Sequence, residues 1–373
     1  MAVSGTIQGV RIAGIACAVP ETVVRNDAFF ARFGEEQMQK FEKMVGVKER
    51  RMASLDDTTS DFACRAMREL SDCWSSEDVD ALLFVSQTPD YQLPATACVL
   101  QYRLGIKKSC VAFDINLGCS GFVYAIFIAS SLLKSGGIRK VAILGGDCSL
   151  KPVSPRDPAA APLFGDCGFA TVLERDETAP PIDYSFCTDG KGYKAIIEPG
   201  VTYGGRMAAG YTPDGLERDV APLLKPSDDG TRKVSEVFMD GMEVFNFTIN
   251  EVPDLIKEQM SRNGLTAKDV DFLVLHQANC FVLKQVALAT GFSMKKVPVC
   301  MDRYGNTSSS SIPLALCDLN ARSKESGVDL GAKKVLMSGF GVGLSWGTLL
   351  CDFDFSACRG IFVGAESFKE GVL

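Results

Sequence analysis

Histidine is nearly absent from this sequence. The 373 residues contain a single histidine, His276, and no two cysteines stand in a CxxC spacing. Structural zinc sites and multi-histidine centres depend on such ligand sets, so the sequence predicts no metal site. The fourteen cysteines show no repeated spacing, which in a chain of this size is typical of reduced thiols and not of a disulfide framework.

Long runs of one charge and long apolar runs are also missing. The formal net charge is −7 and Lys/Arg runs are short, which argues against nucleic acid or an anionic membrane as a partner. No segment has the roughly eighteen uninterrupted apolar residues of a membrane span. The apolar stretch IQGVRIAGIACAVPE contains Arg11 and follows no basic region, so it predicts a buried strand and not a signal peptide. Together these features predict a cytoplasmic protein.

Strand-like runs alternate with segments of helix length along the whole chain, which indicates an α/β fold with a mixed sheet. The predicted strands are Val10–Ala16, Ala81–Gln87, Ser109–Ile115, Lys140–Gly145, Ala170–Leu173, Phe272–His276, Val297–Cys300, Lys334–Gly339 and Trp346–Phe353. A long amphipathic helix is predicted near Met239–Asn263.

Two stretches of the first half recur in order in the second half. DVDALLFVSQ from Asp78 matches DVDFLVLHQ from Asp269, a shift of 269 − 78 = 191, and VAFDINLGCSGF from Val111 parallels VCMDRYGNTSSS from Val299, a shift of 299 − 111 = 188. Each half then runs through a helix-length segment into an apolar strand that ends in glycines. Two matched blocks in register favour duplication over chance similarity of α/β units.

The duplication divides the chain into residues 1–180 and 181–373, with residues 181–265 mostly an insertion or lid and a helix. Equivalent strand ends of the two halves carry Cys119, His276 and Asn306. A pseudo-twofold axis would bring these three together at the C-terminal ends of strands, where α/β folds bind ligands.

Cys119 lies between Gly118 and Gly121 at the expected start of an apolar helix. The N–H groups and the positive dipole end of a helix stabilise a thiolate, so this position predicts a nucleophile with a lowered pKa. The alternative is a small buried apolar side chain, as most of the other cysteines are expected to be.

Together with Cys119, His276 and Asn306 allow two kinds of chemistry. A Cys/His/Asn set serves papain-type hydrolases, in which His activates Cys, and condensing enzymes, in which His and Asn stabilise an enolate. Papain's local CGSCW surroundings are missing, and the duplicated framework favours condensation. Asn306 could instead cap a turn, with the serines after it starting a helix.

Four motifs together resemble the β-ketoacyl-acyl carrier protein synthase III family of the thiolase superfamily: FDINLGCSGFVYAI, LVLHQAN, YGNTSSSSIPLAL and SGFGVGLSWG. The glycines of the last motif do not have the GxGxxG spacing of a dinucleotide loop. The resemblance extends from about Val10 to Phe353. It implies a thiolase-like, five-layered αβαβα fold built from two duplicated halves, and a homodimer.

The resemblance also implies the chemistry. Cys119 would accept an acyl primer, and His276 and Asn306 would bind the thioester carbonyl of malonyl-acyl carrier protein during a decarboxylating Claisen condensation. The backbone N–H of Cys119 and one from the Gly341–Val342 turn would form the oxyanion hole. No cofactor is implied, since acyl-CoA or acyl carrier protein thioesters are the substrates and the acyl carrier protein is the partner.

The sequence departs from the family's pattern around the substrates. The family's acetyl-CoA users clamp the adenine with a Trp and an Arg, and Lys40 and Met44 stand at those positions. The family commonly has an arginine for carrier docking where Phe281 stands here, and Lys284 is the nearest base. Leu93 matches a residue, often Phe, that enters the partner's acyl pocket. These departures predict a primer longer than acetyl and a specialised member of the family.

The residues expected to contact substrate are Leu93, Gln277, Asn279, Phe281 and Lys284. Three alternatives to condensation stay open at this point: an acyltransferase that makes esters or amides through acyl-Cys119, a less active partner subunit of a heteromeric synthase, and a cysteine hydrolase. The first needs the same Cys and His, so the sequence does not separate it from condensation.

Overall fold

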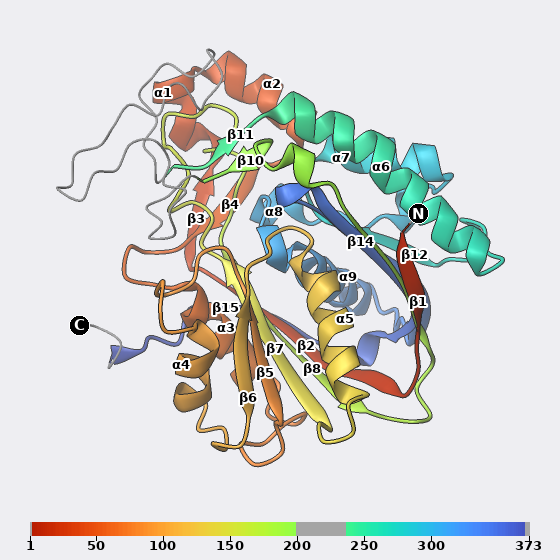
Figure 1. Cartoon of the computed structure of the whole chain (residues 1–373). Helices are drawn as coiled ribbons and strands as arrows, with labels where there is room; N and C mark the ends of the chain where they lie inside the picture. The colour runs from red at the N-terminus through yellow and green to blue at the C-terminus, as the bar shows by residue number, and fades with distance from the viewer. Residues whose placement is uncertain (1, 199–235, 370–373) are drawn as a thin grey trace.

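Two mixed β-sheets dominate the structure, a computed structural model that describes residues 2–198 and 236–369 (Figure 1). The six-stranded sheet has, in order, β15 (Cys358–Val363), β2 (Val10–Val19), β8 (Cys167–Arg175), β7 (Lys140–Asp147), β5 (Ala81–Val85) and β6 (Val111–Ile115). The five-stranded sheet has β1 (Val3–Ile7), β9 (Ile182–Thr188), β14 (Ser345–Asp354), β13 (Ala332–Gly341) and β12 (Phe272–Leu275).

Helices form three layers around these sheets. Helices α5 (Gly121–Leu133) and α9 (Ser311–Glu325) lie between the sheets and share one apolar core with strands of both. Helices α3 (Thr59–Arg68) and α4 (Thr96–Arg103) cover the outer face of the six-stranded sheet. The outer face of the other sheet is covered by α6 (Gly241–Arg262), with α7 (Cys280–Thr290) packed beside it. The predicted αβαβα layering is confirmed.

The two sheets repeat one topology, as the sequence duplication predicts. β5 pairs parallel with β7, and β7 pairs antiparallel with β8; β12, β13 and β14 repeat this pattern. The capping hydrogen bonds repeat as well. The Asp80 carboxylate accepts from Arg139 N at 2.8 Å, and the Asp271 carboxylate accepts from Lys334 N at 2.9 Å.

Two sequence predictions were wrong. Val297–Cys300 forms no strand: the Gln277 side chain donates to the carbonyl of Pro298 and accepts from Cys300 N, and Pro298 has no N–H to donate to a ladder. Residues 181–265 are also more than an insertion, because β9 pairs with β1 and β14 within the core sheet. The strands β1 and β15 were not predicted either.

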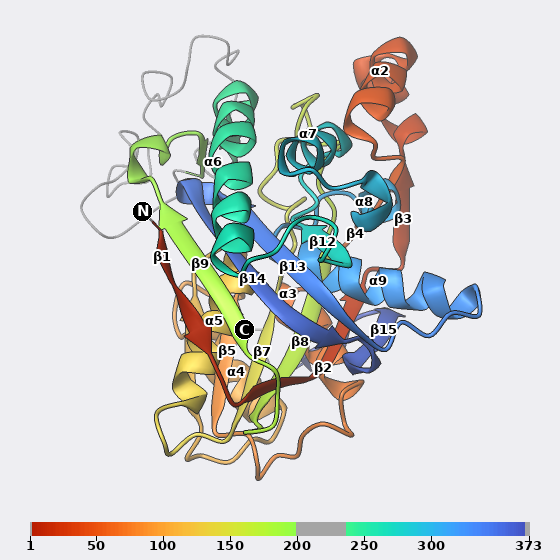
Figure 2. The ribbon, with the colours of Figure 1, turned by 90° about the vertical axis from the view of Figure 1, so that its right-hand side faces the viewer.

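Smaller elements surround the end of the molecule where α7 begins. Figure 2 shows α2 (Glu35–Val45) and the β3–β4 ribbon (Thr22–Arg25 and Glu49–Met52) projecting on the side of α7. The remaining elements are α1 (Phe30–Phe33), α8 (Met301–Tyr304) and the short pair β10 (Ile196–Ile197) and β11 (Phe238–Met239). No helix in the described ranges combines the length and apolar character required to cross a bilayer. The sequence also has a glycine-rich segment at 200–215, which lies outside those ranges.

Candidate active site

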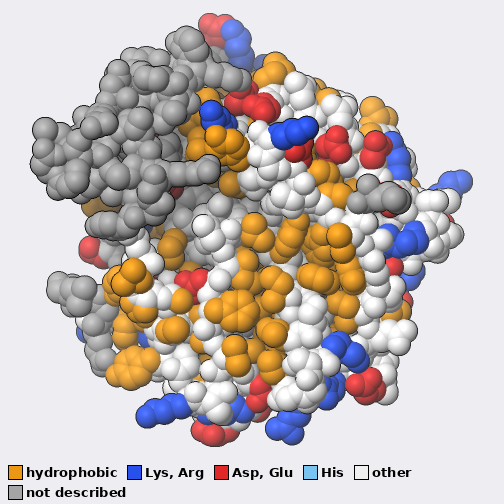
Figure 3. Space-filling view, in the orientation of Figure 1, with side chains coloured by type: hydrophobic (Ala, Val, Ile, Leu, Met, Phe, Trp, Pro, Cys, Tyr) orange, Lys and Arg blue, Asp and Glu red, His pale blue; other side chains and the backbone are white. Residues whose placement is uncertain are grey.

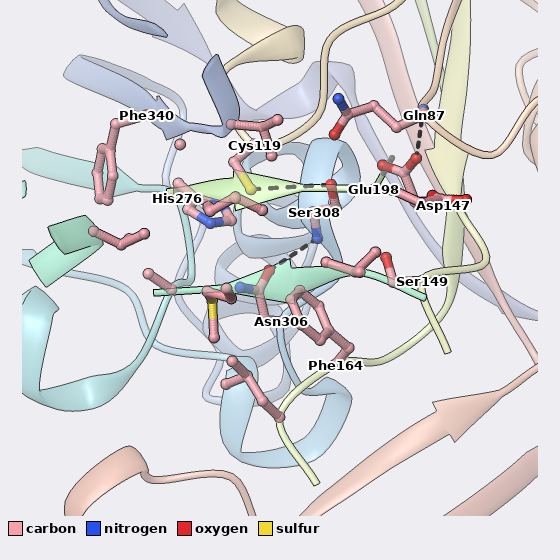
Figure 4. Close-up of a pocket in the computed structure, with 18 of the residues that line it drawn as sticks. Gln87, Cys119, Asp147, Ser149, Phe164, Glu198, His276, Asn306, Ser308 and Phe340 are labelled. Atoms are coloured by element: carbon pink, nitrogen blue, oxygen red, sulfur yellow. Dashed lines mark hydrogen bonds between the residues drawn. The ribbon is translucent and has the colours of Figure 1, made fainter. Parts of the chain in front are cut away.

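The structure brings the three predicted catalytic residues to one cavity (Figure 4). The cavity has a volume of about 510 Å³, and Cys119, His276 and Asn306 all line it. Their exposed fractions are 6%, 2% and 5%, respectively. Cys119 comes from the first half and the other two from the second, so the cavity forms where the two duplicated halves meet.

Cys119 follows β6 and stands two residues before α5, where neighbouring chain segments crowd its sulfur. A Cβ atom added to Gly341 would lie 2.6 Å from Cys119 Cβ, and one added to Gly121 would lie 2.6 Å from a methyl of Val85. Real Cβ atoms do not approach so closely, so glycine is required at both positions. The small residues around this cysteine therefore let two backbones close over it.

The prediction of a lowered pKa for Cys119 was wrong. Burial, and secondarily the charge of Asp147, raise the pKa of the Cys119 thiol to about 12. Hydrogen bonds from Ser308 and from the backbones of Cys119 and Val342 lower the pKa by less than burial raises it. Cys119 is therefore a protonated thiol in the free protein, because the loss of hydration outweighs the helix start.

His276 follows β12, and its backbone N–H donates to Ser338 O of β13 at 2.8 Å. Burial lowers the pKa of this imidazole to about 3, so the ring is neutral at physiological pH. Its Nδ1 lies 2.7 Å from Ser311 Oγ in the first turn of α9, and Phe340 packs edge-on against the ring. These contacts fix the ring plane and leave Nε2 as the other polar atom.

Asn306 is held from both sides of its peptide. Its N–H donates to Leu163 O at 2.9 Å, and its carbonyl accepts from Gly165 N at 3.0 Å. The side-chain Oδ1 accepts from Ser308 N at 3.0 Å. A backbone N–H can only donate, so this bond assigns the amide orientation and leaves Nδ2 as a donor for a substrate.

The buried carboxylate of Asp147 accepts hydrogen bonds from both halves of the chain. Asp147 Oδ1 accepts from Gln87 N at 2.8 Å, while Oδ2 accepts from Ser309 Oγ at 2.7 Å and Ser309 N at 3.2 Å. Gln87 belongs to the first half and Ser309 to the second. Asp147 thus fixes the turn after Asn306 against the first half.

The predicted substrate-contacting residues are not all placed at the cavity. Asn279 lines it, although its Oδ1 accepts from Val282 N at 2.7 Å as the N-cap of α7. Gln277 does not line it: this side chain is buried, and its amide bonds the backbone of Leu275, Pro298 and Cys300. Its role is to hold the 298–300 segment.

The remaining predicted contacts lie outside the cavity of their own chain. Phe281 is 45% exposed and stacks on Phe245, which does line the cavity, with ring centroids 5.5 Å apart. Lys284 is exposed on the first turns of α7. Leu93 is 83% exposed and is not among the lining residues.

Sequence reasoning missed two neighbours of the three predicted catalytic residues. Ser311 was interpreted as one of several helix-starting serines, and only the fold shows which serine reaches the imidazole. Phe340 is one apolar residue among many in a strand. A sequence signal existed for Asn306, because it lies in the repeat partner of the cysteine turn.

Comparison with known proteins gives the family. Residues 113–190 match the model of 3-oxoacyl-[acyl-carrier-protein] synthase III, and residues 260–353 match that of its C-terminal part. A β-ketoacyl-[acyl-carrier-protein] synthase III of Methylococcus capsulatus is 33% identical over 91% of this chain and 98% of its own length. The chain belongs to the β-ketoacyl-[acyl-carrier-protein] synthase III family. Membership of this family makes the protein an acyl-transferring enzyme of the thiolase-like fold.

Other members of the family are similar over the same extent. A synthase III of Clostridium perfringens is 32% identical over 92% of this chain and 99% of its own. The crystal structure of a 3-oxoacyl-(acyl-carrier protein) synthase from Burkholderia xenovorans matches with a TM-score of 0.88 and 35% identity, over 97% of this chain and 99% of that one. The chain is thus similar to synthase III proteins over nearly its whole length.

Proposed function

We propose that this protein catalyses a decarboxylating Claisen condensation between an acyl primer held on Cys119 and a malonyl thioester on an acyl carrier protein. One observation carries the proposal: a buried thiol, a neutral imidazole and an amide donor line the same cavity. The product is a β-ketoacyl thioester, which agrees with the family to which the chain belongs.

Loading transfers the primer to the sulfur. Cys119 attacks the carbonyl of an acyl thioester, the carbon–sulfur bond to CoA or to the carrier breaks, and the thiol proton of Cys119 ends on the departing sulfur. The backbone N–H groups of Cys119 and Val342 both hydrogen-bond toward the Cys119 sulfur. We propose that they stabilise the oxyanion of the tetrahedral intermediate.

Decarboxylation uses the two donors of the second half. The malonyl carboxylate leaves as CO₂, and its bonding electrons form an enolate whose oxygen accepts hydrogen bonds from His276 Nε2 and Asn306 Nδ2. In the tautomer with the proton on Nε2, which this step requires, Ser311 Oγ donates to His276 Nδ1. A histidine with a pKa near 3 stays neutral, so in this step it acts as a hydrogen-bond donor and not as a general base.

The enolate carbon then attacks the acyl-Cys119 carbonyl. The new carbon–carbon bond replaces the bond to sulfur, and the released Cys119 thiolate takes up one proton. The electron pair of the new bond comes from decarboxylation, and the pair of the broken carbon–sulfur bond leaves with the Cys119 sulfur. Since nothing is oxidised or reduced, we propose that no metal or redox cofactor takes part.

To test this function, the protein is mixed with acyl-CoAs and with malonyl-acyl carrier protein that carries ¹⁴C in the free carboxylate of its malonyl group. The expected result is a mass increase at Cys119 equal to the acyl group, followed by release of labelled CO₂ and a β-ketoacyl carrier. Acyl transfer from Cys119 to an alcohol or amine without CO₂ release would instead establish the acyltransferase alternative.

The carrier is proposed to dock where α6 and α7 begin. Both helices contribute lining residues near their N-terminal ends, including Phe245 and Asn279. The exposed Phe281 ring stacks beside them, and Lys284 supplies a positive charge one turn later. An apolar contact at Phe281 then takes the place of the family's arginine.

We further propose a homodimer through β6. β6 ends the six-stranded sheet, so its outer edge is unpaired within the described ranges. Hydrophobic side chains gather over α5 and β6 in Figure 3. Val111 is 48% exposed there, and Phe127 and Ile128 are partly exposed. Two copies of one edge strand pair antiparallel about a twofold axis. Leu93 would then reach the partner's cavity.

Substitution of Val111 by lysine tests this dimer. The charged side chain should block pairing of the two β6 edges, so light scattering after gel filtration should show a dimer for the wild type and a monomer for Val111→Lys. Val328→Lys is the matched control, since Val328 is also an exposed valine but lies in the loop after α9. A monomeric wild type at micromolar concentration would refute the proposal.

The number of unpaired cysteines is the basis for a proposal about the cell compartment. All fourteen cysteines are unpaired in the structure, and nine of them besides Cys119 are buried as thiols. Free thiols in this number persist in a reducing compartment. We therefore propose a cytoplasmic location.

A further inference from the structure

One carboxylate in the cavity has no part in the proposed reaction. Glu198 follows β10 and lines the cavity on the side of Gln87, Asp147 and Ser149, away from His276 and Phe340 (Figure 4). Many other lining residues of the cavity are apolar, among them Val153, Leu163, Phe164, Ile196, Ile197 and Val237. A pocket that takes only an unsubstituted acyl chain has no use for a carboxylate at this place.

Glu198 differs from the other cavity carboxylate, Asp147. The Asp147 oxygens accept hydrogen bonds from Ser86, Gln87 and Ser309, so they serve the fold. Within residues 2–198 and 236–369, Glu198 makes no hydrogen bond or ion pair. Its side chain is exposed at the cavity edge, and partial desolvation raises the pKa of this carboxyl above its usual value. Its acceptor oxygens are therefore available to a bound molecule.

Further polar groups stand on the same side. Gln87 faces the turn before Cys119: its Oε1 is the nearest atom to a Cβ added to Gly118. Ser149 lines the cavity beside it and is 8% exposed. Glu198, Gln87 and Ser149 thus make one polar sector of the wall, within the same cavity as the Cys119 sulfur.

We propose that this sector selects the primer: the acyl group loaded on Cys119 carries a hydrogen-bond donor, a hydroxyl or an amine, that Glu198 accepts. The inference rests on the proposed function, since it concerns the acyl group of the same reaction. An unsubstituted chain would strip water from Glu198 without replacing its hydrogen bonds, and sites built to bond a donor discriminate against analogues that lack it.

The test measures the rate of Cys119 acylation by intact-protein mass spectrometry with matched thioesters. Butyryl-CoA is compared with 3-hydroxybutyryl-CoA, and hexanoyl-CoA with its 6-hydroxy and 6-amino derivatives. In the wild type, the best substituted primer of either length should load roughly 10- to 100-fold faster than its unsubstituted match, the range of one hydrogen bond to a charged group.

Three variants make the result specific. Glu198→Leu should lose this preference and load the unsubstituted chain at least as fast, while Glu198→Gln, which keeps an acceptor oxygen, should retain the hydroxyl preference and lose the amine preference. Glu251→Leu is the control, since Glu251 is exposed on α6 and does not line the cavity. Thermal melting of each variant verifies folding.

The possible failures are distinguishable. In one outcome, the wild type loads unsubstituted chains as fast as every substituted chain, and Glu198→Leu gives the same ratio of loading rates. This outcome would overturn the role of Glu198 and leave the proposed condensation intact. Absence of acylation at Cys119 by all the thioesters in all folded variants would overturn the proposed function itself.

Discussion

His276→Ala and Asn306→Ala variants are expected to accept an acyl group on Cys119 at near wild-type rates and to lose most of their ability to release CO₂ from malonyl-acyl carrier protein. Each side chain supplies one hydrogen bond to the enolate oxygen, and removal of such a donor typically lowers the rate about 10²- to 10³-fold. Loading instead relies on the backbone N–H groups of Cys119 and Val342, which neither substitution removes.

Loading and decarboxylation are measured separately, by mass spectrometry and by ¹⁴CO₂ release. Asn320→Ala is the matched control: Asn320 is equally buried, and its amide donates to Cys358 O at 3.1 Å, but it does not line the cavity. This control should lower stability while both half-reactions persist in the folded protein. Loss of loading with CO₂ release retained in Asn306→Ala would reverse the assigned roles.

Cys119→Ala is expected to abolish acylation and condensation together, with no acyl group found on the other thirteen cysteines. The structure changes the reason for this selectivity. With a pKa of about 12, Cys119 has a very small thiolate fraction at neutral pH, so its reaction depends on the oxyanion donors and not on a standing thiolate. Raising the pH increases the thiolate fraction about tenfold per unit below that pKa.

Two reagents separate these effects. Alkylation of Cys119 by iodoacetamide, which uses the thiolate alone, should accelerate steeply from pH 7 to pH 10 without reaching a plateau. Peptide mapping gives the rate for each cysteine, and Cys98→Ala removes an exposed thiol as a control. A plateau near pH 7 would show a lowered pKa and contradict the burial argument.

Much of the fold could be predicted because duplication leaves a trace in the sequence. The aspartates of the DVD motifs cap equivalent strands, and this shared role explains why Asp80 and Asp271 match. Cys119, His276 and Asn306 were predictable for the same reason: Cys119 and His276 each follow a strand of the repeat, and Asn306 lies in the repeat partner of the cysteine turn.

The wrong predictions concern properties that depend on surroundings. The pKa of Cys119 is set by burial, which the local sequence of a helix start does not reveal. Gln277 reads as a polar residue next to a catalytic histidine, and only the fold shows its amide committed to backbone groups. The role proposed for Glu198 had no sequence signal either, because the cavity that it lines is built from several separate segments.

Duplication also explains why a single chain carries this chemistry. With the repeat shift of 188, Cys119 corresponds to position 119 + 188 = 307, which is Thr307. Two identical halves would carry the same residue at both places, either a thiol twice or not at all. The two halves of this chain differ there, so the Cys119 thiol comes from one half while His276 and Asn306 come from the other. The asymmetry of the cavity therefore depends on the difference in sequence between the two halves.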